Sequence, residues 1–369
     1  AVLMPPMSTP IASFFISCFR LKVSFILSKL IENSATPKFF PIFGTVSDPK
    51  VPFKTMQTNE QMLSAIENYL ELLYAPIGYS LAGGGKRLRP MLLTLSCGIF
   101  SDDVKQALPA AAAVEVFHNF TLLHDDIMDN AAVRRGKPSV HAKWGQNVAI
   151  LSGDAMMIYA YRLLSSVPAN LLPQVLSTFN TMALEVCEGQ QYDMDFEQKP
   201  KVSVVEYMHM IELKTSVLLA GSVVIGAMLG GASDEDCRRL RRFAVELGLA
   251  FQLQDDLLDS YGDQRLGKAI GGDILEGKKT YLMITAMSHA DEATREMLRT
   301  AYRDPALSDA EKIGKVKSIY DRLDVPRLTE QQIQLRFERA LSILDTLSVA
   351  PSRTQRMRDY AMSLMDRKN

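Results

Sequence analysis

The chain has 369 residues, of which 47% are hydrophobic and 22% are charged, and its formal net charge is −1. This length allows one large core or two ordinary domains, and the near-neutral charge excludes the basic footprint of a nucleic-acid-binding protein. The four cysteines are scattered without a CxxC pair, so we expect no disulfide framework and no zinc site. This cysteine usage favours a reducing compartment such as the cytoplasm.

Residues 1–55 differ in charge from the rest of the chain. They contain six Lys or Arg residues and two acidic residues, a net of +4, which leaves −5 for residues 56–369. Such an acid-poor, serine-containing leader is typical of a transit peptide. Two other interpretations stay open: translation begins at Met56 and the leader is not part of the natural chain, or the leader is a genuine extension. We expect the fold to occupy residues 56–369, and an organellar location only if the leader is a transit peptide.

From residue 59 onward the hydrophobic pattern is helical almost throughout. The first stripe has the i, i+4, i+8 and i+11 spacing of one helix face, and its residues are Met62, Ile66, Leu70 and Leu73. Further helical patterns cover residues 107–126, 148–167, 172–194, 203–229, 234–259 and 282–303. Sustained strand alternation is absent, and charges interrupt the long apolar stretches. The sequence therefore predicts an all-α, single-domain helical bundle with no transmembrane segment.

Two segments, "FTLLHDDIMD" and "FQLQDDLLD", are apolar helical runs that end in Asp-Asp-x-x-Asp. Asp125 and Asp129 stand at i and i+4, and therefore on one helix face. Asp255 and Asp259 repeat this geometry. A single acidic cluster is typical of a solvated helix end, but two clusters that face one cavity would repel each other unless divalent cations lay between them. Oxygen ligands without His or Cys favour Mg²⁺ or Mn²⁺, and Mg²⁺ commonly bridges carboxylate and phosphate, which predicts a phosphorylated substrate.

Basic residues suited to such a substrate occur after a run of glycines and beside the first acidic cluster. Arginine forks and lysine point charges are the usual ligands of diphosphates. Each of these residues alone is typical of a surface charge, but together they predict a site for two diphosphates. They are Lys86, Arg89, Arg134, Arg135, Lys214, Lys268 and Lys278.

His118 lies two helical turns before Asp125, on the same predicted helix face. We expect it to make a polar contact with the second substrate. A hydrogen-bonded core histidine is the alternative interpretation.

These motifs resemble those of the trans-isoprenyl diphosphate synthases, also called polyprenyl synthetases, and most of all those of the geranylgeranyl and farnesyl diphosphate synthases. The shared segments occur in family order and are "GGGKRLRP", "LLHDDIMD", "RRGKP", "GDAMM", "EGQQYDM", "LKTS", "FQLQDDLLD" and "GKKTY". The resemblance implies an all-α bundle around a deep central cavity, usually a homodimer. It also implies Mg²⁺-dependent condensation of isopentenyl diphosphate with a C5 to C15 allylic diphosphate.

The resemblance further implies roles for individual residues. Three Mg²⁺ ions, for which Mn²⁺ could substitute, would be held most directly by Asp125, Asp129 and Asp255. The aspartates that act as ligands or support them would be Asp126, Asp256 and Asp259. The allylic diphosphate would be neutralised by Arg134, Lys214 and Lys268. Isopentenyl diphosphate would be held by Lys86, Arg89, His118 and Arg135, with Lys278 as a further substrate contact. The polar residues that face the forming carbocation would be Thr215, Gln190 and Gln252.

The length of the product should depend on the helix that precedes Asp125. Thr121, Phe120 and Phe117 stand four, five and eight residues before it, near one helix face, so a bulky side chain there can form a floor for the growing chain. For Phe117, ordinary core packing is the alternative. In the family, an aromatic residue five positions before the motif and a small residue at four resemble the geranylgeranyl synthases. We therefore expect mainly a C20 product, with C15 next.

Two rival functions stay open at this point. A class I terpene cyclase also ionises an allylic diphosphate with Mg²⁺, but it would need neither the second cluster of this form nor the Lys86 and Arg89 segment. A non-catalytic regulatory subunit would be expected to lose metal ligands, whereas both motifs are intact here.

Overall fold

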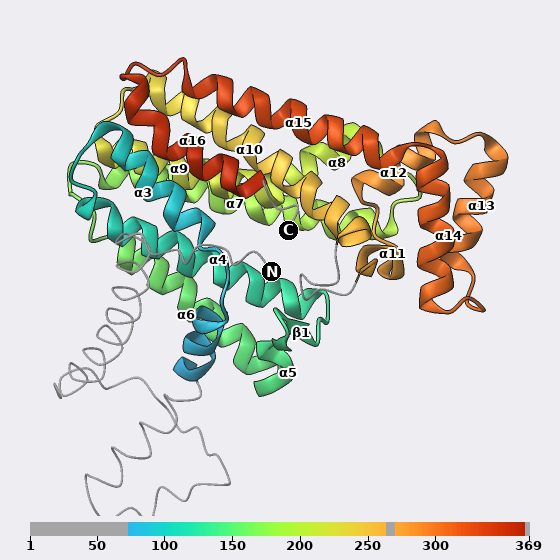
Figure 1. The fold of residues 1–369 in the computed structure, drawn as a ribbon. Coiled ribbons are helices and arrows are strands. Elements are labelled where there is room, and N and C mark those ends of the chain that lie inside the picture. Colours follow the sequence, from blue (N-terminus) through green and yellow to red (C-terminus); the bar gives the residue numbers. More distant parts are fainter. Residues whose placement is uncertain (1–72, 263–269, 366–369) are drawn as a thin grey trace, which may run out of the picture. The chain divides into compact units, whose positions relative to one another are not determined.

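Helices make up nearly all of the structure (Figure 1). The computed structural model describes residues 73–262 and 270–365, so the leader, Met56 and the stripe residues before Leu73 lie outside it. A helical segment covers residues 73–82. The helices of the first half are α3 (Leu88–Phe100), α4 (Leu108–Met128), α5 (Val140–Trp144), α6 (Gln146–Leu164) and α7 (Leu172–Gln198). Those that follow are α8 (Val204–Ile211), α9 (Val217–Gly230), α10 (Asp234–Tyr261), α11 (Gly272–Glu276), α12 (Tyr281–His289), α13 (Glu292–Arg303), α14 (Asp309–Arg322), α15 (Val325–Leu344) and α16 (Pro351–Met365).

The strands of the described residues form one short hairpin between α4 and α5. Strand β1 (Val133–Arg134) pairs antiparallel with β2 (Lys137–Pro138). The prediction of an all-α fold is thus confirmed, with this hairpin as a local addition.

Helix α9 is the central element of the bundle. Every residue from Val217 to Ala227 is buried, as expected for a helix that is apolar on all sides. It packs against α3, α7 and α10. At Gly226 the contact with α3 is so close that a Cβ atom would lie 2.0 Å from the carbonyl oxygen of Leu93, and only glycine fits there.

Two of the predicted helical stretches are interrupted. Residues 203–229 form α8, then a π-helical turn over Glu212–Ser216, then α9. Residues 282–303 are divided into α12 and α13. Asp291 is the N-cap of α13, because its side chain accepts a hydrogen bond of 2.8 Å from the backbone N–H of Thr294. Both interruptions leave the hydrophobic pattern unchanged, so the pattern did not reveal them.

One stretch of the described residues, Val204–Gly230, is long and apolar enough to cross a membrane by length and composition. In the bundle, 78% of its most apolar window is buried. This burial is expected, because α9 is the central helix of the bundle.

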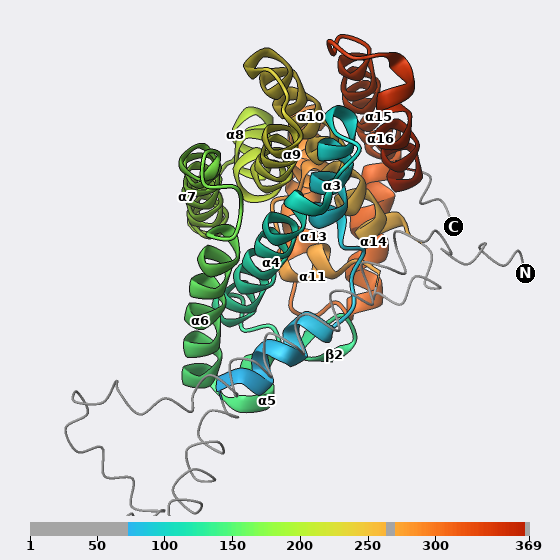
Figure 2. The ribbon, with the colours of Figure 1, turned by 90° about the vertical axis from the view of Figure 1, so that its left-hand side faces the viewer.

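The two aspartate helices, α4 and α10, both pack against α9. A separate core of α11, α12, α13 and α14, which includes the buried Tyr320, lies at the end of α10 that carries the second cluster. Figure 2 shows α11 and α14 on the same side of α4, with α6 and α7 on the other. The second cluster therefore lies beside a helical subassembly of its own.

Candidate active site

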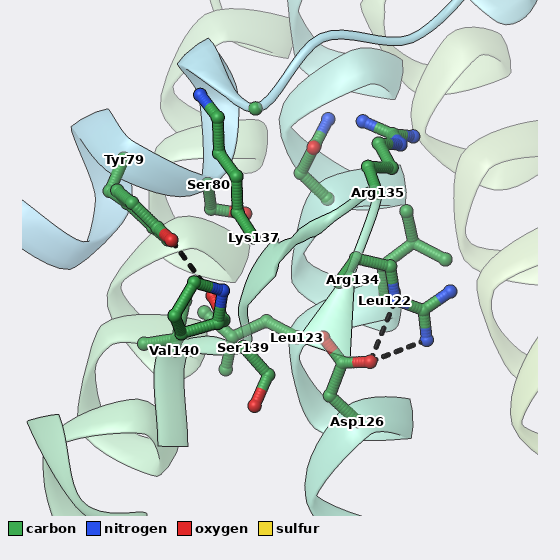
Figure 3. Close-up of a pocket in the computed structure, with 13 residues that line it drawn as sticks. Tyr79, Ser80, Leu122, Leu123, Asp126, Arg134, Arg135, Lys137, Ser139 and Val140 are labelled. Carbon is green, nitrogen blue, oxygen red and sulfur yellow. Dashed lines mark hydrogen bonds and ion pairs between the residues drawn. The ribbon is translucent and has the colours of Figure 1, made fainter. Parts of the chain in front are cut away.

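The first aspartate cluster lies at the end of α4, where the β1–β2 hairpin turns back onto it. Arg134 of β1 donates from Nε to Asp126 Oδ1 at 2.7 Å and from Nη2 to Asp125 Oδ2 at 3.0 Å. Figure 3 shows the Arg134 guanidinium against Asp126. Asp126 is buried, whereas Asp129 at the helix end is exposed. Of the three carboxylates in the cluster, Asp126 is thus the one that is buried and that accepts the shorter of the two hydrogen bonds from Arg134.

Burial and charge act against each other in this cluster. Burial raises the pKa of Asp126, and the hydrogen bond from Arg134 opposes the shift. Burial also raises the pKa of Asp129, and the nearby charge of Asp125 adds to it. These carboxylates are therefore more easily protonated than free aspartates unless further cations join them.

Lys214 lies in the π-turn and connects two helices of the site. Its Nζ contacts Asp193 Oδ2 of α7 at 2.6 Å and Asp125 Oδ1 of α4 at 3.2 Å. Burial lowers the pKa of this ammonium, but Asp125 and Asp193 outweigh the effect and raise it. Lys214 therefore stays charged against the first cluster.

The next residue of the turn, Thr215, connects to the second cluster. Its hydroxyl donates to Gln252 Oε1 at 3.0 Å, and Gln252 Nε2 donates to Asp256 Oδ1 at 3.1 Å. Asp256 is buried and also accepts from the Tyr207 hydroxyl and the Tyr281 N–H. Burial raises the pKa of Asp256 to about 6, although these hydrogen bonds oppose the shift. Two consecutive residues of one turn are thus linked to the two aspartate motifs, Lys214 directly and Thr215 through Gln252.

The second cluster continues into α11. Asp259 Oδ2 accepts a hydrogen bond of 3.0 Å from the N–H of Asp273. Burial and the charge of Asp259 raise the pKa of Asp273 to about 7, and Lys278 opposes this shift as it opposes that of Asp129. Lys278 also pairs with Glu276 at 2.8 Å. Lys278 therefore acts on Asp129 of the first cluster and on Asp273, the hydrogen-bond partner of Asp259. Lys268, the other lysine predicted here, lies outside the described residues.

A basic cradle lies about two helical turns before the first cluster along α4. Arg89 Nη1 contacts His118 Nε2 at 3.0 Å. Because a guanidinium only donates, this nitrogen of His118 accepts and the imidazole is neutral. Burial, and then the charges of Arg89, Arg135 and Arg134, hold the pKa of His118 well below its usual 6.5. Burial lowers the pKa of Arg89 to about 10, against the charge of Glu115.

The glycine-rich loop joins this cradle. Arg87, in the left-handed conformation with φ 51°, pairs with the buried carboxylate of Glu115. Arg135 of the hairpin donates to the Gly84 carbonyl, and a Cβ on Gly85 would lie 2.9 Å from its guanidinium. Because Gly85 has no side chain, the backbone of the loop can contact the Arg135 guanidinium directly. The next residue, Lys86, is exposed.

The hairpin is anchored to the helical segment 73–82. The Tyr79 hydroxyl donates to the Pro138 carbonyl at 2.8 Å (Figure 3). The ammonium of Lys143 lies 4.4 Å from the ring centroids of both Tyr79 and Trp144, a cation–π contact. Tyr79 and Pro138 line a small pocket together with Arg134, Arg135 and Asp126.

The predicted floor residues of α4 belong to a chain of aromatic rings. Phe117 is fully buried, 5.5 Å from the ring of Phe120 and 5.1 Å from that of Phe179 on α7. Phe120 is half-buried and lies 4.7 Å from the His124 ring. Thr121 donates its hydroxyl to the His118 carbonyl at 2.8 Å. Phe117 has the environment of a core residue, so Phe120 is the better candidate for a floor.

Sequence reasoning missed three acidic residues of the site. Asp193, Asp273 and Glu115 are single carboxylates that belong to no paired motif, and their partners are distant in the chain. In "EGQQYDM", which contains Asp193, only Gln190 was predicted, and in "GKKTY", which follows Asp273, only Lys278. Gln190, predicted in the first of these, has a buried Nε2 for which the described residues offer no hydrogen-bond partner.

The α-helical bundle contains two Asp-Asp-x-x-Asp helices that are linked by one π-turn, and an arginine hairpin contacts the first of them. This arrangement is that of the isoprenoid-synthase class. The chain belongs to the polyprenyl synthetase family, since the model of that family, "Polyprenyl synthetase", matches residues 70–323. The geranylgeranyl diphosphate synthase of Methanosarcina mazei is 42% identical over 261 residues, which cover 68% of this chain and 80% of that protein.

Solved structures agree with this assignment. A geranylgeranyl pyrophosphate synthase superposes with a TM-score of 0.77 at 40% identity, covering 85% of this chain and 100% of that one. The geranylgeranyl pyrophosphate synthase of Corynebacterium glutamicum, solved with isoprenyl diphosphate and magnesium, superposes with a TM-score of 0.74 at 28% identity, covering 84% of this chain and 96% of that one.

The neutral state of His118 makes a pH-dependent contribution to stability. Because its pKa is depressed in the folded protein, the unfolded chain binds the extra proton below pH 6.5 and stability falls as the pH falls. Replacing His118 by Gln should remove up to about 1.4 kcal/mol per pH unit of this loss. Urea unfolding between pH 7.5 and 5 measures the difference. Parallel losses in both proteins would contradict a neutral His118.

Proposed function

We propose that this protein is a prenyltransferase that condenses isopentenyl diphosphate with an allylic diphosphate and yields mainly geranylgeranyl diphosphate, with farnesyl diphosphate next. One observation carries the proposal: consecutive residues of a single π-turn reach both aspartate helices. Lys214 contacts Asp125 of α4, and Thr215 donates to Gln252, which in turn donates to Asp256 of α10. The names of the similar proteins support the same reaction.

The carboxylates of the two motifs suit magnesium. Their donors are all oxygens, and among the described residues no three acidic, His or Cys side chains converge closely enough to hold an ion alone. Mg²⁺ fits such an arrangement, because it keeps waters and takes other ligands from phosphate oxygens. Asp125, Asp129, Asp255 and Asp259 would hold up to three ions, with Mn²⁺ as a substitute, and Asp126 and Asp256 would orient their neighbours. Bound Mg²⁺ would supply charge stabilisation for the departing diphosphate.

The residues around the first cluster account for ionisation. Lys214 and Arg134 bind the allylic diphosphate and stabilise the negative charge that grows as its C1–O bond breaks. The oxygens of Thr215 and Gln252, fixed by their mutual hydrogen bond, face the resulting allylic cation. Burial of the site keeps water from quenching this cation.

The basic cradle accounts for the second substrate. Lys86, Arg89 and Arg135 bind the diphosphate of isopentenyl diphosphate, and neutral His118 fixes the Arg89 fork. The double bond of isopentenyl diphosphate attacks C1 and forms the new C–C bond. The proton lost from the neighbouring carbon then passes to the bound pyrophosphate, which balances the reaction without a protein nucleophile.

The protein is proposed to act as a cytoplasmic homodimer. Helix α6 presents Leu151 and Ile158, 59% and 69% exposed and two turns apart, and α7 presents Leu184, 66% exposed. Leu151 and Ile158 stand seven residues apart and therefore form an apolar face of α6, of the kind that protein partners cover. The thiols of Cys97, Cys187 and Cys237 are free, which suits a reducing compartment.

Replacing Asp125 by Ala should lower turnover by at least about 10²–10³-fold, because it removes a carboxylate that carries metal and cations. The fold should persist, since Lys214 would still pair with Asp193, and Arg134 would still pair with Asp126. The measurement is extension of C5, C10 and C15 primers by radiolabelled isopentenyl diphosphate with Mg²⁺. The exposed Asp195, replaced by Asn, is the matched control. Full activity of the Asp125 variant would contradict the assignment of Asp125 as a metal ligand. If the unaltered protein extended none of the primers, the proposed reaction would be wrong.

Replacing Phe120 by Ala should lengthen the product beyond C20, because it removes the half-buried ring nearest the aspartates. Chromatography of the dephosphorylated products measures their length. The Phe117→Leu variant is the control, and its product should not change because Phe117 packs in the core. A shift in the Phe117 variant alone would place the floor one turn deeper.

Replacing Ile158 by Glu should produce monomers, because a charge on the apolar face would be buried without a partner. Analytical ultracentrifugation measures the change. Val205→Glu, at a site that is 79% exposed on α8, should leave the dimer intact. A dimeric Ile158 variant would place the interface elsewhere.

A further inference from the structure

The π-turn that carries Lys214 and Thr215 is flanked by a glycine on each side. Gly189 of α7 contacts its backbone: a Cβ there would lie 2.2 Å from Lys214 N and 2.6 Å from Leu213 C. Gly248 of α10 contacts its last residue, with a Cβ position 2.6 Å from Ser216 Oγ and 2.8 Å from Ser216 Cα. Neither position tolerates a methyl group unless the turn or its neighbour moves.

The conformational freedom of glycine does not explain these positions. Both residues lie inside long helices and neither has a positive φ. A glycine in a helix interior costs about 0.5–1 kcal/mol relative to alanine. The close approach of another backbone is the feature that compensates for this cost, and both approaches are to the same five-residue turn.

A π-turn needs such neighbours for a geometric reason. Its i→i+5 hydrogen bonding widens the helix locally, so the backbone bulges towards the helices packed on it. Here α7 lies on one side and α10 on the other. The bulge brings Lys214 to Asp125 and Asp193 and brings Thr215 to Gln252. The position of these two side chains therefore depends on how closely α7 and α10 approach the turn.

We propose that Gly189 and Gly248 are positioning residues, which fix Lys214 and Thr215 by allowing α7 and α10 to contact the backbone of the π-turn. The inference rests on the proposed function, and it adds to the site two residues with no side-chain chemistry of their own. Gly189 acts through Lys214, whose backbone it contacts directly. Gly248 acts through Ser216, next to Thr215.

The test compares Gly189→Ala and Gly248→Ala with Gly226→Ala, which introduces an equally close contact between α9 and α3 away from the turn. In protein that remains folded, the first two variants should lose about 10²-fold in kcat, as expected for an ångström-scale misplacement. Their KM for isopentenyl diphosphate should stay nearly unchanged, because its cradle lies on α3, α4 and the hairpin. The Gly226 variant should lose thermal stability but keep its kcat.

A double-mutant cycle separates positioning from general damage. If Gly189 acts through Lys214, then adding Gly189→Ala to Lys214→Ala should cost less than about 3-fold more in kcat. Titration calorimetry with inorganic pyrophosphate and Mg²⁺ should show the same weakening of Kd in Gly189→Ala and in Lys214→Ala. Additive losses in kcat, or an unchanged Kd for pyrophosphate in the Gly189 variant, would overturn the proposal for Gly189.

The Gly248 position offers a rescue that remains available if the Gly189 variant does not fold. Adding Ser216→Gly to Gly248→Ala removes the Oγ and Cβ atoms that the new methyl group would meet and leaves only the contact with the Ser216 Cα at 2.8 Å. The double variant should therefore recover part of the lost kcat. No recovery, with both proteins equally stable, would overturn the positioning role of Gly248. Retained kcat in both folded glycine variants beside an active unaltered protein would reject this inference alone, whereas an inactive unaltered protein would reject the proposed function.

Discussion

The ammonium of Lys214, held between Asp125 of α4 and Asp193 of α7, is the contact on which the organisation of the site depends. Several carboxylates at one end of a bundle repel each other, and burial makes the repulsion worse. Lys214 and Arg134 offset this repulsion from two directions, one from the core and one from the hairpin. The same cations are suited to diphosphate oxygens. When a substrate binds, Lys214 and Arg134 would therefore exchange carboxylate oxygens for diphosphate oxygens. Little reorganisation of these side chains would then be needed when negative charge develops on the departing diphosphate.

The charge of the residues around α4 changes along the helix, and this change would separate the two proposed substrates. Near the C-terminal end of α4 the carboxylates of its aspartate motif dominate, and a diphosphate would join them only together with metal ions. Two to three turns earlier, Arg87, Arg89 and Arg135 surround a single buried carboxylate, Glu115, and a diphosphate would need no metal to bind there. The neutral His118 belongs to this basic region, because burial and the surrounding arginines disfavour its protonation. One helix would thus keep apart two ligands with the same head group.

The sequence predicted the fold class well because the hydrophobic period of 3.6 residues is strong in nearly every segment. It also marked the paired aspartates and most of the basic residues, because these repeat or cluster along the chain. It did not reveal the π-turn, since residues 203–229 form one continuous helical pattern and the helices that contact the turn, α7 and α10, come from other parts of the chain. Asp193, Asp273 and Glu115 were missed for the same reason: each gains its importance from a partner in another element. Such residues become visible only when distant segments are brought together.

The hairpin would have a mechanical consequence for the two proposed substrates. Arg134 donates to the carboxylates of α4, while its neighbour Arg135 donates to the glycine-rich loop. Their Cα atoms are joined by one trans peptide unit of about 3.8 Å, which limits how far the two guanidinium groups can move apart. Tyr79, whose ring packs against Trp144, ties the hairpin to the helical segment 73–82. If the two arginines bind the two diphosphates as proposed, the hairpin acts as a spacer, and covalent geometry sets part of the distance between the reacting carbons.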